Sequence, residues 1–285
     1  MKIALLTCEK LPELTPADQM LIPELAKHQI FAKAVIWDDK TVQWHDFDYL
    51  IFRNTWDYYE KELQFNAWLN QIEAMGIKTL NSLNTIKVNK HKFYLQELES
   101  KGIEIIPTIF IDKTESLVLS EIIPSHWQKA VIKPAFSGGS YLTEVFNVEN
   151  IEQINTIYKP IAIGKDLLLQ KFIPQIQTLG ETSFIFFNKK FSHCVNKKPI
   201  DGDFRVQVQF GGKYTLIYTD AKLIQKAQQI VDTFTEPLLY ARVDGIVINN
   251  ELLLMEVECI EPDLYFSLSG GSQRRFVQSI LELIR

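Results

Sequence analysis

The most informative stretch of the chain is Ala241-Arg-Val-Asp-Gly-Ile-Val-Ile-Asn-Asn-Glu-Leu-Leu-Leu-Met-Glu-Val-Glu258. Two apolar runs flank Asn249-Asn250, and Asn tolerates the positive φ angles of a tight turn, so the stretch predicts a β-hairpin. Side chains alternate between the two faces of a strand. Asp244 therefore points to one face of the first strand, and Glu256 and Glu258 share one face of the second.

The register of this hairpin determines whether the three carboxylates meet. A two-residue turn would place Asp244 opposite Met255, whereas a three-residue turn over residues 249–251 pairs it with Glu256. The residues between the acids are apolar, which predicts a largely buried strand pair. Buried carboxylates repel one another and need a compensating positive charge. On these chemical grounds we favour the three-residue turn.

A hard divalent cation is one way to compensate the three carboxylates. Mg²⁺ takes oxygen ligands and commonly bridges them to nucleotide phosphates. The alternative is a salt-bridged cluster in which Arg242, on the same face as Asp244, takes part with Arg274 or Arg275. Both interpretations remain open from the residues alone.

Two lysines and a loop of small residues could bind phosphate. Lys133 ends the apolar strand that begins at Lys129, and Ser137-Gly-Gly-Ser140 follows it. Small residues let backbone N–H groups approach phosphate oxygens closely, although a tight turn also explains the loop. Lys90 lies in the first turn of a predicted helix over Asn89–Lys101, where a cation opposes the helix dipole. It either faces a phosphate or is simply solvated.

Composition limits the class of protein. The 285 residues are 46% hydrophobic with a formal net charge of −5, which allows a large core and shows no basic stripe for nucleic acid. No apolar run is long enough for a membrane helix, and the first one is too short for a signal peptide. The three cysteines are scattered, which fits a reducing compartment. We therefore expect a cytoplasmic protein.

The predicted order of strands and helices changes near residue 88. Before it, strands alternate with helices, which predicts a parallel sheet with right-handed crossovers. After residue 166 the strands come in succession, which predicts antiparallel α+β structure. The expected strands are Lys2–Cys8, Phe31–Trp37, Tyr49–Arg53, Ile77–Leu80, Ile103–Ile111, Lys129–Lys133, 167–173, 182–188, 190–197, 204–210, 213–218 and the hairpin Tyr240–Glu258; the expected helices are Pro16–His28, Tyr59–Met75, Asn89–Lys101, Asp220–Thr235 and Ser272–Arg285.

Residues for a substrate are harder to identify. Arg53 and Trp56 follow a predicted parallel strand, and polar groups beyond the carboxyl end of such strands often line a ligand crevice. Arg53 could bind a carboxylate, Trp56 could wall the pocket, and Glu9 could lie nearby. The alternative is a loop that caps the next helix. His193 and Lys197 share a strand face and could approach a nucleotide.

Taken in order, these segments resemble the ATP-grasp superfamily across most of the chain. The resemblance implies a fold of mixed α/β and α+β class: a Rossmann-like pre-ATP-grasp domain over residues 1–88 on the substrate side, then a small ATP-grasp lobe over 89–165 and a large lobe over 166–285. Within the superfamily the chain looks like the glutathione synthetase-like branch. The segments Phe191–Pro199, Gly202–Gln207 and Met255–Pro262 are similar to the cyclo-ligases of the cycloserine pathway.

The resemblance also implies ATP and Mg²⁺ as cofactors and a role for each motif. For the phosphates, it implies that Lys90 and Lys133 contact the α- and β-phosphates and that a mobile loop covers the triphosphate, formed by Ser137, Gly138, Gly139 and Ser140. For the nucleoside, it implies a hinge formed by Gln170, Lys171, Phe172 and Ile173, in which the backbone of Lys171 and Ile173 contacts adenine; Glu181 binds the ribose, and Lys197 also contacts the nucleotide. For the reaction, it implies that Arg205 binds the γ-phosphate and the acyl phosphate and that magnesium is held by Asp244, Glu256 and Glu258. Many members have Glu where this chain has Lys171, and Asn where it has Glu258.

The implied activity is a ligase reaction. A carboxylate would be activated as an acyl phosphate and passed to an amine or thiol, with small molecules as partners, no nucleic acid, and a homodimer as one assembly to consider. The alternatives are an intramolecular cyclo-ligase that acts on one small amino acid derivative, a small-molecule kinase, and a nucleotide-binding regulator without turnover.

Overall fold

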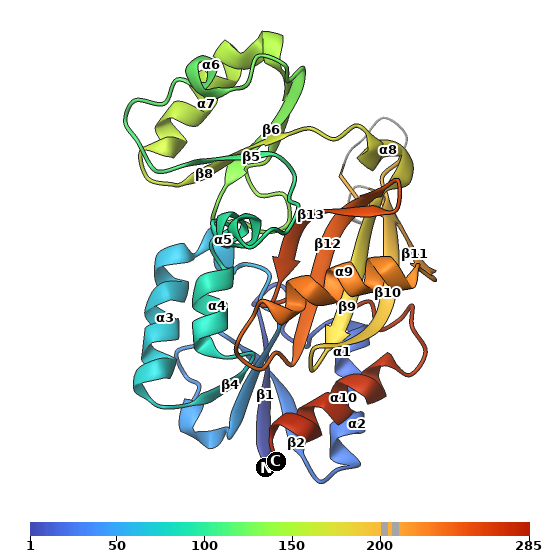
Figure 1. The fold of residues 1–285 in the computed structure, drawn as a ribbon. Helices are drawn as coiled ribbons and strands as arrows, with labels where there is room; N and C mark the ends of the chain where they lie inside the picture. Colours follow the sequence, from blue (N-terminus) through green and yellow to red (C-terminus); the bar gives the residue numbers. More distant parts are fainter. Residues whose placement is uncertain (201–204, 207–210) are drawn as a thin grey trace.

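A computed structural model describes residues 1–200, 205–206 and 211–285 of the chain. The described residues form one parallel and two antiparallel sheets, which make up an N-terminal domain, a small lobe and a large lobe (Figure 1). The predicted fold class is confirmed. The predicted strand 204–210 and the segment Gly202–Gln207 lie mostly outside the described residues. Within these residues, no helix combines the length and apolarity required to cross a membrane.

The N-terminal domain is built on a four-stranded parallel sheet in the order β2-β1-β3-β4. Its central strands, β1 and β3, are buried from their second residue to their last because both faces of the sheet are covered. The elements are β1 (Lys2–Thr7), α1 (Pro16–Gln19), α2 (Leu21–Ala26), β2 (Phe31–Ile36), η1 (Trp44–Asp46), β3 (Tyr49–Asn54), η2 (Tyr58–Glu60), α3 (Glu62–Ala74), β4 (Lys78–Leu80) and α4 (Leu83–Asn89). The helix expected over Pro16–His28 is thus two helices, which meet at Met20.

Helices from both ends of the chain cover this sheet. On one face, α3 packs an aromatic cluster that includes Phe65 and Trp68. The other face, which carries Ile3 and Leu5, packs against α2 and against Phe276 of the last helix, α10 (Ser272–Leu283). Both termini therefore lie at the same end of the molecule (Figure 1). The N-terminal domain is completed by the C-terminal helix.

The small lobe is a four-stranded antiparallel sheet in the order β5-β8-β6-β7. Its elements are α5 (Tyr94–Ser100), β5 (Thr108–Ile111), α6 (Leu119–Ile122), β6 (Lys129–Pro134), β7 (Glu144–Asn147), η3 (Val148–Asn150), α7 (Ile151–Ala162) and β8 (Leu167–Lys171). Because β8 pairs with both β5 and β6, the lobe extends at least to Lys171, and the boundary predicted at residue 165 is wrong.

The helix predicted over Asn89–Lys101 is also wrong. Helix α4 ends at Asn89, Lys90 caps its C-terminus, and α5 begins only at Tyr94. A cation at a helix C-terminus is favoured by the helix dipole, so the placement of Lys90 is not anomalous.

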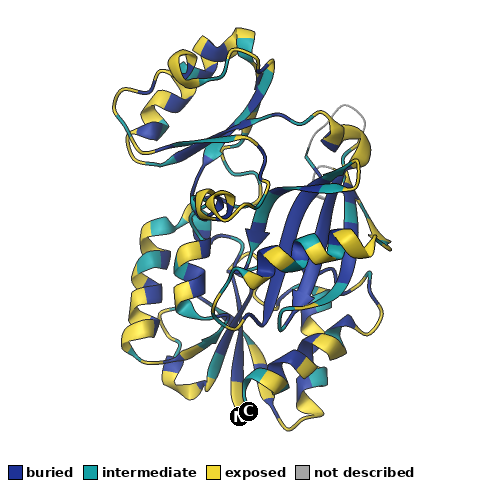
Figure 2. Ribbon diagram, in the orientation of Figure 1, coloured by how far each residue is buried: buried dark blue, intermediate teal, exposed yellow. Residues whose placement is uncertain are grey.

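The large lobe is a five-stranded antiparallel sheet in the order β11-β10-β9-β12-β13. Its elements are α8 (Gln175–Leu179), β9 (Glu181–Phe187), β10 (Lys190–Lys198), β11 (Lys213–Ile217), α9 (Ala221–Asp232), β12 (Tyr240–Ile248) and β13 (Glu251–Glu258). One face packs on α9, which buries Leu223 and Ala227 against Val243 and Leu254. Figure 2 shows the buried strands beneath a helix whose outer side is exposed. The opposite face carries the polar residues discussed next.

Candidate active site

The hairpin β12–β13 combines the two registers considered from the sequence. Ile248 pairs with Glu251 across a two-residue turn, so the predicted three-residue turn is wrong. Asp244 nevertheless pairs with Glu256, because the register shifts between Asp244 and Gly245. Met255 is the extra residue of a β-bulge on β13.

This bulge changes which way the second half of β13 faces. Leu252 and Leu254 belong to the core against α9, and strict alternation would send Glu256 and Glu258 into that same core. The extra residue at Met255 reverses the alternation, so Val257 packs in the core and both glutamates face the other side. Gly245 permits the distortion, since a Cβ there would lie 2.6 Å from the Leu253 carbonyl oxygen.

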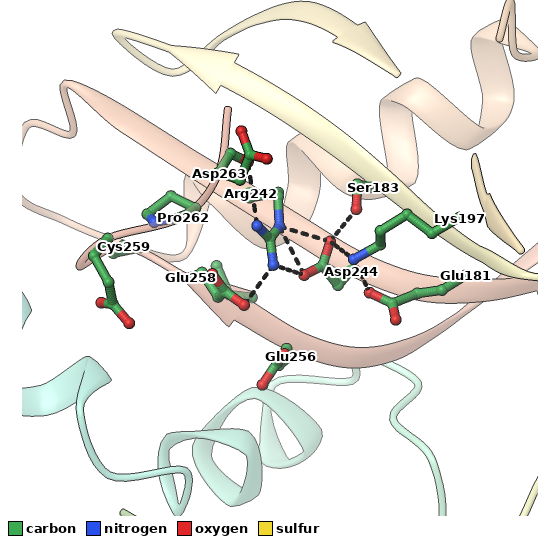
Figure 3. A network of polar contacts seen from close by, with 12 residues as sticks. Glu181, Ser183, Lys197, Arg242, Asp244, Glu256, Glu258, Cys259, Pro262 and Asp263 are labelled. Atoms are coloured by element: carbon green, nitrogen blue, oxygen red, sulfur yellow. Dashed lines mark hydrogen bonds and ion pairs between the residues drawn. The ribbon is translucent and has the colours of Figure 1, made fainter. Parts of the chain in front are cut away.

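Three carboxylates meet on the polar face of this hairpin. One oxygen each of Asp244, Glu256 and Glu258 lies within 4.8 Å of the others (Figure 3). Asp244 is fully buried and both glutamates are half-buried. Three convergent hard oxygen donors suit a magnesium-type cation, so these residues fit the metal that the sequence predicted.

Arg242 compensates part of this negative charge. Its Nε lies 2.9 Å from Asp244 Oδ2, and its Nη2 lies 2.5 Å from Glu258 Oε1 (Figure 3). The other proposed partners lie elsewhere, because Arg274 is near Glu24 and Arg275 bonds Ser192. The salt-bridged arrangement is therefore present through Arg242 alone of the three arginines, and it leaves Glu256 outside the Arg242 pairs.

Glu256 faces two lysines from other parts of the chain. Lys92 Nζ lies 3.7 Å from Glu256 Oε2. Burial opposes ionisation of Glu256, but the charges of Lys92 and Lys133 outweigh it and lower its pKa to about 2. Burial in turn lowers the pKa of Lys133. Among the described residues none forms a hydrogen bond or ion pair with the ammonium of Lys133, so this group is available to an anion.

The sequence predicted a phosphate contact for Lys90 and none for Lys92, whose ammonium faces Glu256. The Lys90 ammonium instead contacts Asn66 Oδ1 on α3 and lies 5.8 Å from the Phe136 ring. Lys92 lies in the same short segment as Lys90, and the sequence does not distinguish which of the two lysines faces the carboxylates. The carboxylate cluster thus faces Lys92 and Lys133 rather than Lys90 and Lys133.

On the other side of Asp244 lies a buried ion pair. Lys197 contacts the Glu181 carboxylate, and its Nζ lies 3.7 Å from Asp244 Oδ1 (Figure 3). Ser183 donates a hydrogen bond of 2.5 Å to Asp244 Oδ1. Burial raises the pKa of Glu181 despite Lys197. His193 lies on β10, the strand that also carries Lys197, and its Nε2 is hydrogen-bonded to the Leu264 carbonyl. Burial lowers the pKa of His193 to about 4.

The small-residue loop after β6 packs against the N-terminal domain. Ser137 Oγ donates to the Pro134 carbonyl, 2.8 Å away, and Lys92 Nζ donates to the Ser137 carbonyl, 2.5 Å away. A Cβ on Gly138 would lie 2.7 Å from the Tyr59 ring, so only glycine fits this approach. The loop therefore lies next to Lys92 and under a side chain of the N-terminal domain; Gly139 has φ 55° and Ser140 has φ 66°.

The predicted hinge follows β8 out of the small lobe. The Lys171 N–H donates to the Pro107 carbonyl at 2.9 Å, so this backbone donor is already engaged within the sheet. Gln170 Nε2 donates to Thr108 Oγ1, so this side chain is engaged within the sheet. Phe172 donates its N–H to Lys129. Among the described residues, none accepts from the Ile173 N–H.

Arg205 is the chain neighbour of a buried residue. Val206 packs in a cluster with Phe172 of the hinge and Ile246 of β12, two residues beyond Asp244. Arg205 itself is half-buried. Its contact with a phosphate stays a prediction.

The residues expected to bind substrate differ in their burial and in their contacts. Arg53 is fully buried, with Nε 2.7 Å from Asp18 Oδ1 and Nη2 3.0 Å from the Pro262 carbonyl. It therefore connects the N-terminal domain with the large lobe through these bonds and is not exposed to a ligand. Trp56 is half-buried and its Nε1 donates to the Glu261 carbonyl. Glu9 is exposed at the end of β1.

Comparison with solved structures establishes the fold. A D-alanine–D-alanine ligase from Bacillus anthracis, complexed with ATP, superposes with a TM-score of 0.69 at 16% identity over 99% of this chain and 96% of that chain. A RimK domain ATP-grasp protein from Sphaerobacter thermophilus gives 0.69 at 14% identity over 99% and 98%. This chain therefore has the ATP-grasp fold.

One relative is similar over nearly its whole length. The crystal structure of D-cycloserine synthetase DcsG superposes with a TM-score of 0.88 at 22% identity over 100% of both chains. The cycloserine biosynthesis protein DcsG of Streptomyces lavendulae is 23% identical over 278 residues, 90% of each protein. The family described as the N-terminal domain of D-cycloserine synthetase DcsG matches residues 3–81. The resemblance to ATP-grasp proteins and to the cycloserine-pathway enzyme is confirmed.

Proposed function

We propose that this chain is an ATP- and magnesium-dependent ligase that activates a carboxylate as an acyl phosphate and transfers it to an amine. The supporting observation is the meeting of Asp244, Glu256 and Glu258 opposite Lys92 and Lys133 at the junction of the two lobes. A site with opposed acidic and basic sides suits a triphosphate bound through a cation.

The residues divide the work by chemistry. Asp244, Glu256 and Glu258 hold magnesium, which shields the phosphate charges when it is bound. Lys92 and Lys133 supply fixed positive charge to the phosphates. The remaining proposed roles are those that the ATP-grasp resemblance implies: the loop Ser137–Ser140 covers the triphosphate, the Lys171 carbonyl and Ile173 N–H meet the adenine edge, Glu181 with Lys197 meets the ribose, and Arg205 meets the γ-phosphate.

The reaction then needs positioning more than acid–base chemistry. A substrate carboxylate oxygen attacks the γ-phosphorus and ADP leaves, so two anions must be held together while their charge is neutralised. The amine next attacks the carbonyl carbon, phosphate leaves, and the amine loses a proton. The guanidinium of Arg205 offers paired donors to phosphate oxygens in both steps. A covered loop protects the acyl phosphate from water.

The similarity to DcsG favours a substrate that carries both reacting groups. That relative is a D-cycloserine synthetase, and the structural similarity covers both chains from end to end. For this chain we therefore propose ring closure of one small amino acid derivative as the first reaction to test, with intermolecular amide formation second.

A screen of small molecules for ADP release tests the proposal. Amino acid derivatives and dipeptides are supplied singly and in pairs with ATP and Mg²⁺, and hydroxylamine is added to capture an acyl phosphate. ADP release with one compound whose product has the mass of the substrate less one water indicates a cyclo-ligase, whereas a product of two copies, or a requirement for two compounds, indicates a ligase. A stable phosphorylated product without hydroxamate would indicate a kinase instead, and nucleotide binding without any turnover would indicate a regulator.

Arg205→Ala is expected to lower kcat by ~10²–10³, the usual cost of losing one charge-stabilising donor in a transition state. The fold should be kept, because Val206 rather than Arg205 is the buried residue of the pair. Steady-state ADP release and far-UV circular dichroism check both statements. Near-normal turnover in a folded variant would remove Arg205 from the site.

A further inference from the structure

The strand that carries Glu256 and Glu258 is the outer strand of its sheet. β13 pairs with β12 on one side, and an outer strand normally leaves a row of N–H and C=O groups unpaired on the other. The outer edge of β13 is nevertheless occupied. Leu254 exchanges backbone hydrogen bonds of 2.9 Å with Glu104 and Ile106.

Beyond Leu254, side chains take the place of a neighbouring strand. Val257 donates its N–H to Tyr94 Oη, 2.8 Å away, and its carbonyl accepts from the same hydroxyl at 2.9 Å. That carbonyl also accepts from Asn89 Nδ2 at 2.8 Å. Cys259 donates its N–H to Asn89 Oδ1 at 2.8 Å. Asn89 and Tyr94 are both buried, so these bonds form away from water.

The residue held in this way lies between the two proposed metal ligands. Both backbone polar groups of Val257 are fixed, so the backbone that carries Glu256 and Glu258 has little freedom to rotate. Four bonds from two buried side chains also seal the edge where the bulge at Met255 has broken the regular ladder.

The same short segment also binds the phosphate side of the site. Between Asn89 and Tyr94 lies Lys92, whose backbone N–H donates to the Ala135 carbonyl at 2.9 Å and whose Nζ donates to the Ser137 carbonyl. Residues 89–94 therefore contact the small-residue loop with one residue and β13 with two others.

We propose that Asn89 and Tyr94 are positioning residues, which hold the carboxylates of β13 in register with Lys92 and the loop Ser137–Ser140. This inference rests on the proposed function, since it assigns Glu256 and Glu258 to a cation. Because residues 89–94 bind both sides, the distance between the acidic and the basic groups is set by one rigid segment.

Tyr94→Phe tests the proposal because it removes only the hydroxyl and leaves the ring in the core. ADP binding is measured by titration calorimetry with and without Mg²⁺. We expect the magnesium dependence to weaken by about 10–100-fold, as when a group that orients a metal ligand is lost, while metal-free ADP binding changes little. Asn89→Ala should act in the same direction.

Tyr240→Phe is the matched control. Tyr240 is also a buried tyrosine whose hydroxyl bonds two carbonyls, those of Phe52 and Ile260, at 2.8 and 2.7 Å. It should lower the Tm to a similar degree and leave the magnesium dependence of ADP binding unchanged.

The outcomes separate four failures. Equal magnesium dependence in wild type and Tyr94→Phe would overturn the positioning role. An equal effect in Tyr240→Phe would reduce it to general destabilisation. If both Asn89→Ala and Tyr94→Phe fail to fold although β13 keeps its bonds to β12, Glu104 and Ile106, the role is purely structural and the proposal is overturned. Wild-type protein without magnesium-dependent ADP binding would contradict the proposed function itself.

Discussion

Deletion of Met255 is expected to abolish the site and destabilise the large lobe, although it removes a single half-buried side chain. Without the bulge, regular alternation turns Glu256 and Glu258 into the core against α9 and turns Val257 toward the polar face. Breaking a buried ion pair and leaving its charge unpaired costs about 3–5 kcal/mol, a large part of the 5–15 kcal/mol that typical domains possess.

The chain could absorb the deletion only by moving the register at the turn. In that case Leu252 and Leu254 would leave the core instead, which also exposes apolar surface. Soluble yield, thermal unfolding and magnesium-dependent nucleotide binding measure the effect. Met255→Leu is the matched control, because it keeps the residue count and should cost less than about 1.5 kcal/mol. A deletion variant that melts and binds like wild type would refute the role of the bulge.

Glu256→Gln is expected to abolish magnesium-dependent ATP turnover, by ~10³-fold or more, at least the upper end of the loss for one charge-stabilising group. Glu256 is the carboxylate of the three that Arg242 does not pair, and Lys92 and Lys133 keep its pKa at about 2. It is therefore ionised throughout the physiological range and available to a cation. The amide is nearly the same size, so the fold should persist.

Glu251→Gln provides the comparison for this substitution. Glu251 begins the same strand, and its substitution removes the same charge; within the described part of the chain it pairs with the lysines Lys222 and Lys226. Its turnover should match wild type. Retention of turnover in Glu256→Gln, or equal loss in Glu251→Gln, would remove Glu256 as a ligand; the measurement is ADP release over a range of Mg²⁺ concentrations.

The sequence predicted the pairing of Asp244 with Glu256 correctly but for the wrong reason. The charge argument required the two carboxylates to meet, and it was satisfied by a bulge instead of a longer turn. Met255 is apolar like its neighbours, so nothing in the local pattern marks it as the extra residue. The position of the bulge is constrained by the need for the carboxylates of the whole site to meet. The alternation of side chains along one strand carries no information about that need.

Other errors also came from contacts between distant segments. Arg53 stands where a substrate ligand is common, and only the fold shows that Asp18 and the Pro262 carbonyl already engage it. The break between α4 and α5 is stabilised by the bond from Lys92 to Ala135, 43 positions further along the chain by their residue numbers. The segment Leu167–Lys171 joins the small lobe because β5 and β6 flank it. Strand and helix periodicity predicted the parallel and antiparallel sheets because these depend on local alternation.

The packing of α10 onto the first sheet has a consequence for how the protein is made. Residues such as Ile3 and Leu5 leave the ribosome before their covering partner Phe276, which follows Leu5 by 271 positions. At about 5–20 residues per second, this apolar face waits roughly 14 to 54 seconds for its cover. This face can therefore be covered only after α10 has left the exit tunnel.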